Sequence, residues 1–402
     1  MTKPSRDFAL EVYFSRWEFK AKYHLTASDA QSLSLNDLLA LASAEDRRQF
    51  DTLWLGYTET WGSPALRAAI AGTFDAITAE EVLTFAGAQE AVYVAMSVLL
   101  SAGDHAIVLT PNYQSAETVP LSICATSGVA LDAANGWSLD LGALRKAIRP
   151  NTKLISINFP NNPTGRILPA EQFGALVSLC REHNLWLFSD EVYRLIERRP
   201  ELRLPQAADA YEKGISLNVM SKAYGLPGLR IGWLGCADRD FLQRCERFKH
   251  YLSICNSAPS EVLARIALGA RERILERNRT LVAGNLAKLE QFFGDYPDLF
   301  EWTVPDGGCV GFPRYKGSEG VEVFAQRLVE ETGVLLLPAS IYRSELTPVP
   351  QDRFRIGYGR SNVGMGLEVL RAWLQGRPVG GGESSKRCER REESLAELDR
   401  GH

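Results

Sequence analysis

The feature that most constrains this chain is an alternation, between about residues 80 and 235, of short apolar runs with stretches of helical periodicity. Short runs rich in Ile, Leu and Val are typical of strands buried on both faces, and helical stretches between them predict crossover connections. We therefore expect an α/β fold around a mostly parallel central sheet. The predicted strands cover residues 106–109, 154–157, 185–188, 215–219 and 231–234.

The rest of the chain has a different pattern of apolar residues. A long helical stretch over 238–295 precedes short predicted strands and helices, which indicate a smaller α+β domain. The strands are expected at 302–304, 309–312, 334–337 and 354–358, and the helices at 321–331 and 365–374. We expect four parts: an N-terminal segment (1–48) packing with the small domain, a large α/β domain (49–275), the small domain (276–375) and a disordered tail (376–402).

Composition excludes several classes of function. The 402 residues contain 45 Lys and Arg against 49 Asp and Glu, a net charge of −4, so we expect no nucleic-acid partner. No apolar stretch has the length of a membrane helix and no signal peptide is visible, so we expect no membrane association and a cytoplasmic location. Seven cysteines form no C-x-x-C pair and five histidines no H-x-x-x-H spacing, so we expect neither disulfides nor a metal site.

Two turns next to predicted elements have the composition of ligand-binding loops. Gly87-Ala88-Gln89 precedes a helix, and the N–H groups of a helix start suit a phosphate, although a plain strand-to-helix turn explains the same residues. Asn162 lies in the irregular loop 158–165, where its amide can meet a polar ligand; an ordinary turn is an equal alternative.

Two further segments carry ionisable groups at strand ends. Asp190 could hold a proton on a heterocyclic nitrogen with Tyr193 bonding the same ring, although a helix N-cap also explains the aspartate. Lys222 lies between two apolar runs, and a buried lysine with a lowered pKa can form a Schiff base. Ser221 and Arg230 supply a hydroxyl and a guanidinium suited to one phosphate.

Together these segments resemble a known family. Ser221-Lys222 with Arg230-Ile231-Gly232 resembles the lysine segment of fold-type I pyridoxal-phosphate enzymes, specifically the class I/II aminotransferases. The segments at 161–165 and 190–193 match that family in the same order, and the resemblance covers about residues 30–375. It implies a three-layer PLP-transferase fold, pyridoxal 5'-phosphate as cofactor and a homodimer with shared active sites.

The resemblance also implies roles for individual residues. Lys222 carries the Schiff base and moves the proton, and Asp190 keeps the pyridine nitrogen protonated. Asn162 and Tyr193 bond the ring oxygen, while Tyr113 stacks on the ring and counts with Lys222 and Asp190 as catalytic. The phosphate is held by Gly87, Ala88, Gln89, Ser221, Arg230 and the neighbouring subunit's counterpart of Tyr57, and the substrate carboxylate is bound by Arg355 with Asn162.

One position departs from the family. Members often carry Ser or Thr three residues before the lysine, where this chain has Val219. Phosphate binding should therefore depend more on Ser221, Arg230 and Tyr57.

The resemblance predicts an aminotransferase acting on an amino acid and a 2-oxo acid. The lysine segment also resembles that of capreomycidine synthase, so a lyase or cyclase on the same cofactor is the alternative. A ligand-sensing regulator is disfavoured because the sheet domain begins too early to leave room for a DNA-binding domain. Phe14, Trp17, Phe19 and Tyr23 could line the entrance to a side-chain pocket, although an amphipathic helix packing on the core explains them equally.

Cleavage after Gln375 should leave activity and melting temperature almost unchanged. The segment that follows has a glycine run, six basic and six acidic residues and few large apolar side chains, so it can bury little area. A loss of several degrees in a thermal melt of the truncated chain would contradict this expectation.

Overall fold

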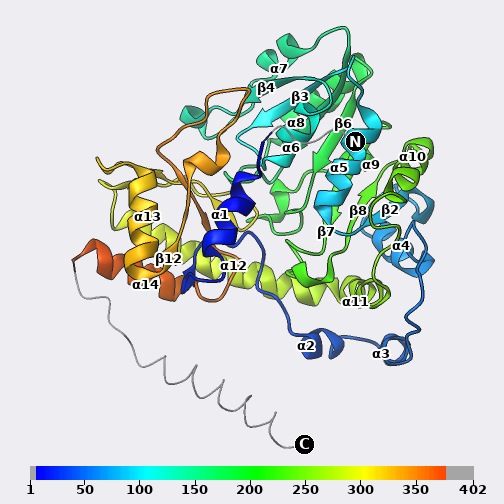
Figure 1. Cartoon of the computed structure of the whole chain (residues 1–402), viewed down its shortest axis with the longest axis horizontal. Coiled ribbons are helices and arrows are strands. Elements are labelled where there is room, and N and C mark those ends of the chain that lie inside the picture. Colours follow the sequence, from blue (N-terminus) through cyan, green and yellow to red (C-terminus); the bar gives the residue numbers. More distant parts are fainter. Residues whose placement is uncertain (1–5, 377–402) are drawn as a thin grey trace, which may run out of the picture.

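The computed structural model describes residues 6–376, and a seven-stranded sheet forms its centre (Figure 1). The strand order is β2-β8-β7-β6-β5-β3-β4, and helices cover the sheet in a three-layer α/β arrangement, which confirms the predicted fold class. The strands are β2 (Val82–Phe85), β3 (His105–Thr110), β4 (Ala125–Ala130), β5 (Thr152–Asn158), β6 (Trp186–Asp190), β7 (Gly214–Val219) and β8 (Gly232–Gly235).

The sheet is parallel except for one strand. β8 runs antiparallel to both of its neighbours, β7 and β2, which corrects the expectation that the run at 231–234 is a parallel strand. The reason is the connection: a loop with only a short 3₁₀ turn joins β7 to β8, and no crossover helix returns the chain to the same edge. β2 and β4 were not predicted. β4 is an edge strand of small and polar residues, so its apolar pattern is weak.

The helices of this part alternate with the strands. α5 packs against α6 and α10, α7 against α8, and α11 against α4. Their bounds are α4 (Pro64–Ala71), α5 (Ala88–Leu99), α6 (Ser115–Leu121), α7 (Leu141–Ala147), α8 (Ala170–Glu182), α9 (Ala207–Ala210), α10 (Arg239–Lys249) and α11 (Ala258–Gly269).

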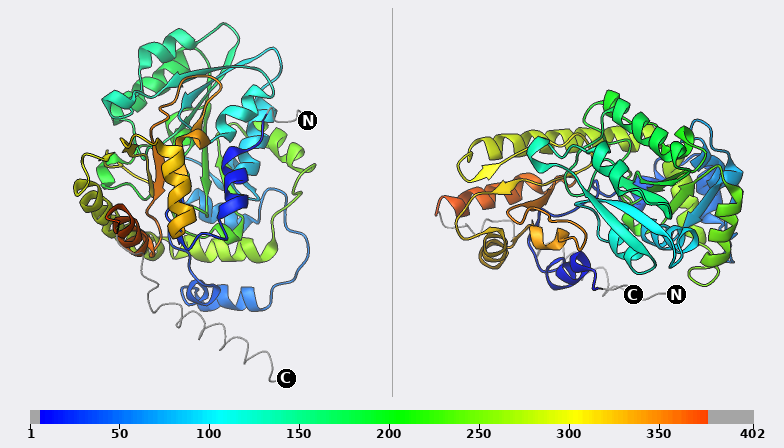
Figure 2. Two further views of the ribbon diagram at one scale, coloured as in Figure 1. Left: turned by 60° about the vertical axis from the view of Figure 1, so that its left-hand side comes forward. Right: turned by 90° about the horizontal axis from the view of Figure 1, so that it is seen from above.

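The C-terminal part is joined to the sheet part by α12 (Arg271–Gly294), a long helix that runs along one side of the molecule (Figures 1 and 2). The stretch 238–295, predicted as helical, is thus three helices, α10, α11 and α12. The remaining elements are β9 (Phe300–Glu301), β10 (Val310–Gly311), β11 (Arg314–Tyr315), α13 (Val321–Thr332), β12 (Val334–Leu335), β13 (Leu337–Pro338), β14 (Phe354–Gly357) and α14 (Val363–Leu374).

Two predicted strands of this part need correction. The strand expected at 302–304 lies at β9 instead, where it pairs with β11. The single strand expected at 334–337 is two strands with different partners, because β12 pairs with β1 and β13 pairs with β14. Leu336, between them, is fully buried, so the chain changes sheets without leaving the core.

The N-terminal segment forms α1 (Ala9–Trp17), β1 (Tyr23–His24), α2 (Leu35–Leu39) and α3 (Ala44–Asp51). Its first half lies against the C-terminal part, where β1 pairs in parallel with β12. Its second half lies against the sheet part instead, because α2 and α3 pack on α11. The division into four parts stays a prediction, and the tail predicted from 376 falls almost wholly outside the described residues.

Within residues 6–376, no helix is long and apolar enough to cross a membrane. The same residues bring together no cluster of three His, Cys, Asp or Glu side chains suited to a metal ion. Six cysteines fall in this range and all are free thiols. The cytoplasmic location stays a prediction.

Candidate active site

The carboxyl ends of the central strands meet at one edge of the sheet and open into a cleft of about 570 Å³. The parallel register pairs Asn158 of β5 with Asp190 of β6, and the loop after β7 carries Lys222 to the same edge. Open α/β sheets place their ligands at this edge. The predicted site residues that line the cleft are Ala88, Gln89, Tyr113, Asn162, Asp190, Tyr193, Ser221, Lys222 and Arg230.

One corner of the cleft is formed by the N-terminus of α5 and by Arg230. Gly87 precedes the helix with φ +96°, and a Cβ there would lie 2.5 Å from Nη2 of Arg230. Glycine at this position therefore lets the guanidinium approach the helix start. Unpaired N–H groups, the positive end of the helix dipole and an arginine together attract an anion such as a phosphate.

Lys222 lies at the centre of the cleft. Its Nζ donates a hydrogen bond of 2.7 Å to Oγ of Ser28, a residue of the N-terminal segment that the sequence did not indicate. Burial lowers the pKa of Lys222, against the opposing negative field of Asp29. A lysine held in this way is more readily deprotonated, and the neutral amine is the nucleophilic form.

Asp190 and Tyr193 lie beside the lysine on the β6 side. Burial raises the pKa of Asp190 to about 6, although the N–H of Val192 donates to Oδ1 at 3.2 Å. The side chain of Tyr193 is 1% exposed, and its hydroxyl has no hydrogen-bond partner within the described chain. A buried donor without a partner is costly, so this hydroxyl is placed to meet a ligand atom.

Arg355 of β14 does not line the cleft itself but bonds to Asn162, which does. The arginine is fully buried; its Nη1 donates to Oδ1 of Asn162 at 3.2 Å and its Nη2 to the carbonyl of Thr26 at 2.7 Å. Tyr342, which the sequence did not single out, donates to the same Asn162 oxygen at 3.2 Å. The side-chain oxygen of Asn162 thus accepts hydrogen bonds from two buried residues, Arg355 and Tyr342. Its amide N–H₂ makes no hydrogen bond within residues 6–376.

The remaining predicted residues have different positions. Tyr113 lines the cleft and packs against Phe8 at 5.1 Å between ring centroids, whereas Tyr57 is 89% exposed and does not line the cleft. Of the four aromatics considered for an entrance, only Phe14 lines the cleft. Val219, named from the sequence as the departure from the family, also lines the cleft. Cleft residues that sequence reasoning missed are Phe8, Leu10, Glu11, Glu18, His24, Ala27, Ser28, Asp29, Val92, Asn158, Val192, Pro227 and Arg360.

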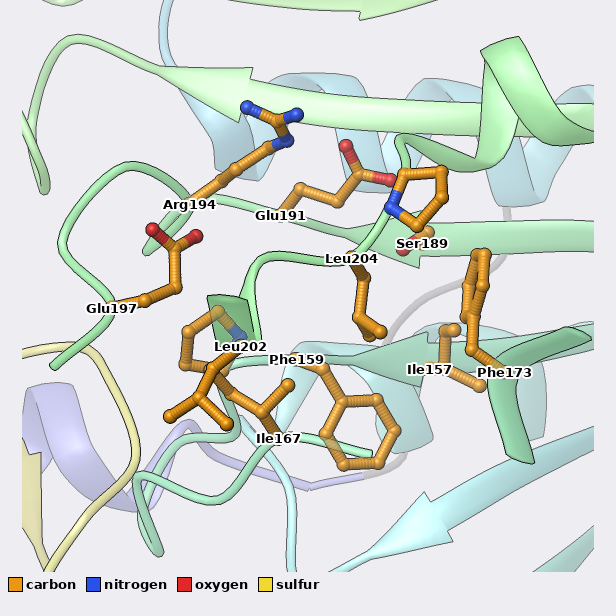
Figure 3. Close-up of a pocket in the computed structure, with 12 residues that line it drawn as sticks. Ile157, Phe159, Ile167, Phe173, Ser189, Glu191, Arg194, Glu197, Leu202 and Leu204 are labelled. Carbon is orange, nitrogen blue, oxygen red and sulfur yellow. The ribbon is translucent and has the colours of Figure 1, made fainter. Parts of the chain in front are cut away.

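A second, much smaller cavity has a volume of about 20 Å³, and Glu191, the residue after Asp190, is one of the residues that line it (Figure 3). Glu191 accepts hydrogen bonds from the N–H of Ala207 and from Ser216, but its Oε2 has no partner among the described residues. Figure 3 shows Glu191 and Arg194 on the polar side of this cavity. Burial raises the pKa of Glu191 to about 7.

Comparison with known proteins identifies the class to which this fold and site belong. The family model "Aminotransferase class I and II" matches residues 22–366, and the chain therefore belongs to this family. The cofactor of the chain is pyridoxal phosphate.

Three relatives show the breadth of the likeness. Capreomycidine synthase of Streptomyces vinaceus is 29% identical, over 91% of this chain and 92% of its own. An arginine–pyruvate transaminase of Pseudomonas aeruginosa is 31% identical, over 78% of this chain and 79% of its own. The crystal structure of a PLP-dependent aminotransferase from Streptococcus suis superposes with a TM-score of 0.86 at 31% identity, covering 92% of this chain and 98% of that one.

The residues of the cleft fit this cofactor. The corner where Gly87 admits Arg230 suits its phosphate, and the unpartnered hydroxyl of Tyr193 suits a ring oxygen. Asp190 is a buried carboxyl whose proton a pyridine nitrogen can share. Lys222 lies in the same cleft, which suits the aldehyde.

Gly87→Ala should weaken binding of pyridoxal phosphate about tenfold or more, because the methyl group meets the Arg230 guanidinium and φ is positive. Equilibrium titration of the apoprotein, read from cofactor absorbance, measures the effect. Gly103→Ala is the matched control, since nothing lies within 4 Å of its Cβ. Equal affinity in the two variants would show that Gly87 does not shape the phosphate corner.

Glu191→Gln should flatten part of the pH dependence of stability. The raised pKa means that the folded protein binds this proton more tightly than the unfolded chain does, so the free energy of unfolding falls as pH rises from about 4.5 to about 7. The glutamine variant should lose less over this window, by about 2 kcal/mol, in urea unfolding at several pH values. Exposed Glu171→Gln is the control, and unchanged slopes in Glu191→Gln would contradict the assignment.

Proposed function

We propose that this chain is a pyridoxal-phosphate-dependent aminotransferase that moves an amino group from an L-amino acid to a 2-oxo acid, with the cofactor attached at Lys222. The observation that carries the proposal is the position of Lys222, which lies between Ser28 and the Asp190 side of one cleft and has a lowered pKa. Membership of the class I and II family supports the reaction type.

The bound cofactor supplies an aldehyde that condenses with amino groups and a ring that withdraws electrons from the bond being broken. Lys222 would have two tasks: its Nζ would hold the cofactor covalently, and as a free amine it would take the proton from the substrate Cα and deliver it to the carbon that the cofactor's aldehyde supplies. Ser28 accepts a hydrogen bond from Nζ and so keeps the amine directed into the cleft. Asp190 would hold a proton on the cofactor's ring nitrogen, and Tyr113, which lines the same cleft, would provide an aromatic surface for the ring.

Two residues are proposed to bind the substrate carboxylate. Arg355 offers a planar pair of donors, and its Nε has no hydrogen-bond partner in the described part of the chain. Because Arg355 is buried behind Asn162, the carboxylate must take the place of one of its present acceptors, Asn162 or the carbonyl of Thr26. Asn162 supplies the amide N–H₂ on the cleft side.

We further propose a homodimer in which Tyr57 serves the phosphate corner of the neighbouring subunit. Trp54, Leu55 and Tyr57 are 81%, 78% and 89% exposed, which is unusual for apolar side chains in a monomer. Thr58 donates to the carbonyl of Asn256, so this segment contacts a second one that also carries exposed apolar side chains, Tyr251 and Ile254.

The alternative is a lyase or cyclase on the same cofactor. The similarity to capreomycidine synthase, which extends over 91% of this chain, favours keeping it. The residues assigned to the cofactor serve both reactions equally, so the fate of the amino group decides between them.

A single-turnover experiment should separate the two reactions. Given an amino acid alone, an aminotransferase should release one equivalent of 2-oxo acid per subunit and stop, and a 2-oxo acid should then restore the original cofactor absorbance. Continuous turnover without an acceptor would overturn the proposal and favour the lyase or cyclase.

Lys222→Ala should abolish turnover, and borohydride reduction of the wild type should attach the cofactor to Lys222 in a peptide map. Exposed Lys146→Ala should behave as wild type in both assays. A reduced adduct on another lysine would contradict the assignment.

Arg355→Ala should lower kcat/KM for the amino acid by an amount that corresponds to about 2–5 kcal/mol of transition-state stabilisation, because it removes one partner of a desolvated charge pair. Arg355→Lys should recover only part of this loss, since an ammonium does not reproduce the planar fork. Cofactor occupancy, measured by absorbance, should stay intact in both variants. Full activity in Arg355→Ala would show that another group binds the carboxylate.

A further inference from the structure

One wall of the cleft is made by α1, and that wall is acidic. Glu11 and Phe14 of α1 and Glu18, the residue that caps its C-terminus with helical backbone angles, follow one another at intervals of three and four residues. They therefore share one face, and all three line the cleft. The opposite arrangement would be normal for a helix packing on a core. Here Val12, on another face, is 56% exposed while the two carboxylates line the cleft.

α1 is fixed in this position from both sides. The N–H of Ala9 donates to Oε1 of Gln114 at 2.8 Å, and Gln114 donates back to the carbonyl of Asp7 at 2.8 Å. At the other side, the hydroxyl of Tyr13 donates to the carbonyl of Leu336 at 3.1 Å. The helix therefore lies across the junction of the sheet part and the C-terminal part (Figure 1).

The two carboxylates have no cation of their own. Neither forms an ion pair or a side-chain hydrogen bond within residues 6–376. Burial and the negative charge of Glu11 raise the pKa of Glu18, and the positive charge of Arg360 only partly opposes this rise. The cations of the cleft are otherwise engaged. Arg360 makes a double contact of 3.0 Å with Asp29, and Arg230 lies at the phosphate corner.

The other two basic groups do not neutralise this wall either. Burial and the nearby Arg360 lower the pKa of His24 to about 4, so the imidazole is uncharged at neutral pH. Lys222 is occupied by Ser28 and is the proposed attachment point. The amide N–H₂ of Asn162, a residue that is 6% exposed and lines the same cleft, makes no hydrogen bond within residues 6–376, so the cleft also offers an unpartnered donor to a ligand on the substrate side.

We infer that the cleft selects amino acids whose side chain ends in a cation, a guanidinium or an ammonium, and that Glu11 of α1 and Glu18 at its C-terminal cap are the specificity-determining residues. The inference rests on the proposed function for the orientation of the substrate, with its carboxylate toward Arg355. A cationic end would then lie under α1 between the two carboxylates. Phe14, whose ring packs on His24 at 5.6 Å between centroids, provides the apolar surface for the side-chain methylenes.

Amino-acid binding to the holoenzyme tests the inference without depending on turnover. Dissociation constants for L-arginine, L-lysine, L-citrulline, L-norleucine and L-glutamate are read from the change in cofactor absorbance. Citrulline and norleucine are neutral counterparts of arginine and lysine. We expect the cationic amino acids to bind about tenfold more tightly than these counterparts, and glutamate to bind most weakly.

The variant Glu11→Gln/Glu18→Gln should abolish this preference. Arginine and lysine should lose about tenfold in affinity, norleucine should change less than about twofold, and glutamate should bind more tightly than to the wild type. Asp7→Asn is the matched control, because it removes one negative charge next to α1 from a side chain that does not line the cleft. It should leave the order of affinities unchanged.

Two results would overturn the inference. One is that neutral amino acids bind the wild type as tightly as cationic ones do. The other is that the double variant weakens binding of all five amino acids equally, which would indicate a structural role. The proposed function fails separately. A cationic preference without transfer to any 2-oxo acid would contradict the aminotransferase and support the specificity, whereas transfer with a preference for neutral or acidic donors would do the reverse. Absence of any spectral response to all five would count against both.

Discussion

The active site depends on the parallel register of β5, β6 and β7. Because these strands run in the same direction, their carboxyl ends meet at one edge of the sheet. The pairing of Asn158 with Asp190 places the last residues of β5 and β6 side by side at this edge. A shift of one residue in β6 would turn Asp190 to the other face and bring Glu191 toward the cleft. The small cavity beside Glu191 shows that the two neighbouring carboxyls already occupy different environments.

Much of this edge could be predicted from the sequence. Strands of buried Ile, Leu and Val have a clear pattern, and polar residues directly after them must gather at the carboxyl edge, which is why Asp190 and Lys222 were found. β4 was missed because its small and polar residues at the sheet edge lack that pattern. The direction of β8 was wrong because an apolar run does not reveal the length of its connection.

The other wall could not be predicted, because it depends on contacts between distant segments. Ser28 reaches Lys222 across 194 residues, and no local pattern around Ser28 marks it as a partner. In the α1 region, sequence analysis considered only the aromatic residues as pocket residues and not the glutamates. The sequence alone does not show which face of an amphipathic helix meets the core. The burial of Arg355 behind Asn162 and Tyr342 is likewise a tertiary result.

The pairing of β1 with β12 has a consequence for how the protein is made. Tyr23 lies opposite Val334, about 310 residues later in the chain, so β1 has no strand partner until most of the protein has been synthesised. Contacts so distant in sequence form late because the intervening loop must close first. The sheet part can fold while the ribosome is still working, and α1 can already bond to Gln114 of that part. The second anchor of α1, the carbonyl of Leu336, is added only when the C-terminal part emerges, so the wall that α1 forms is fixed last.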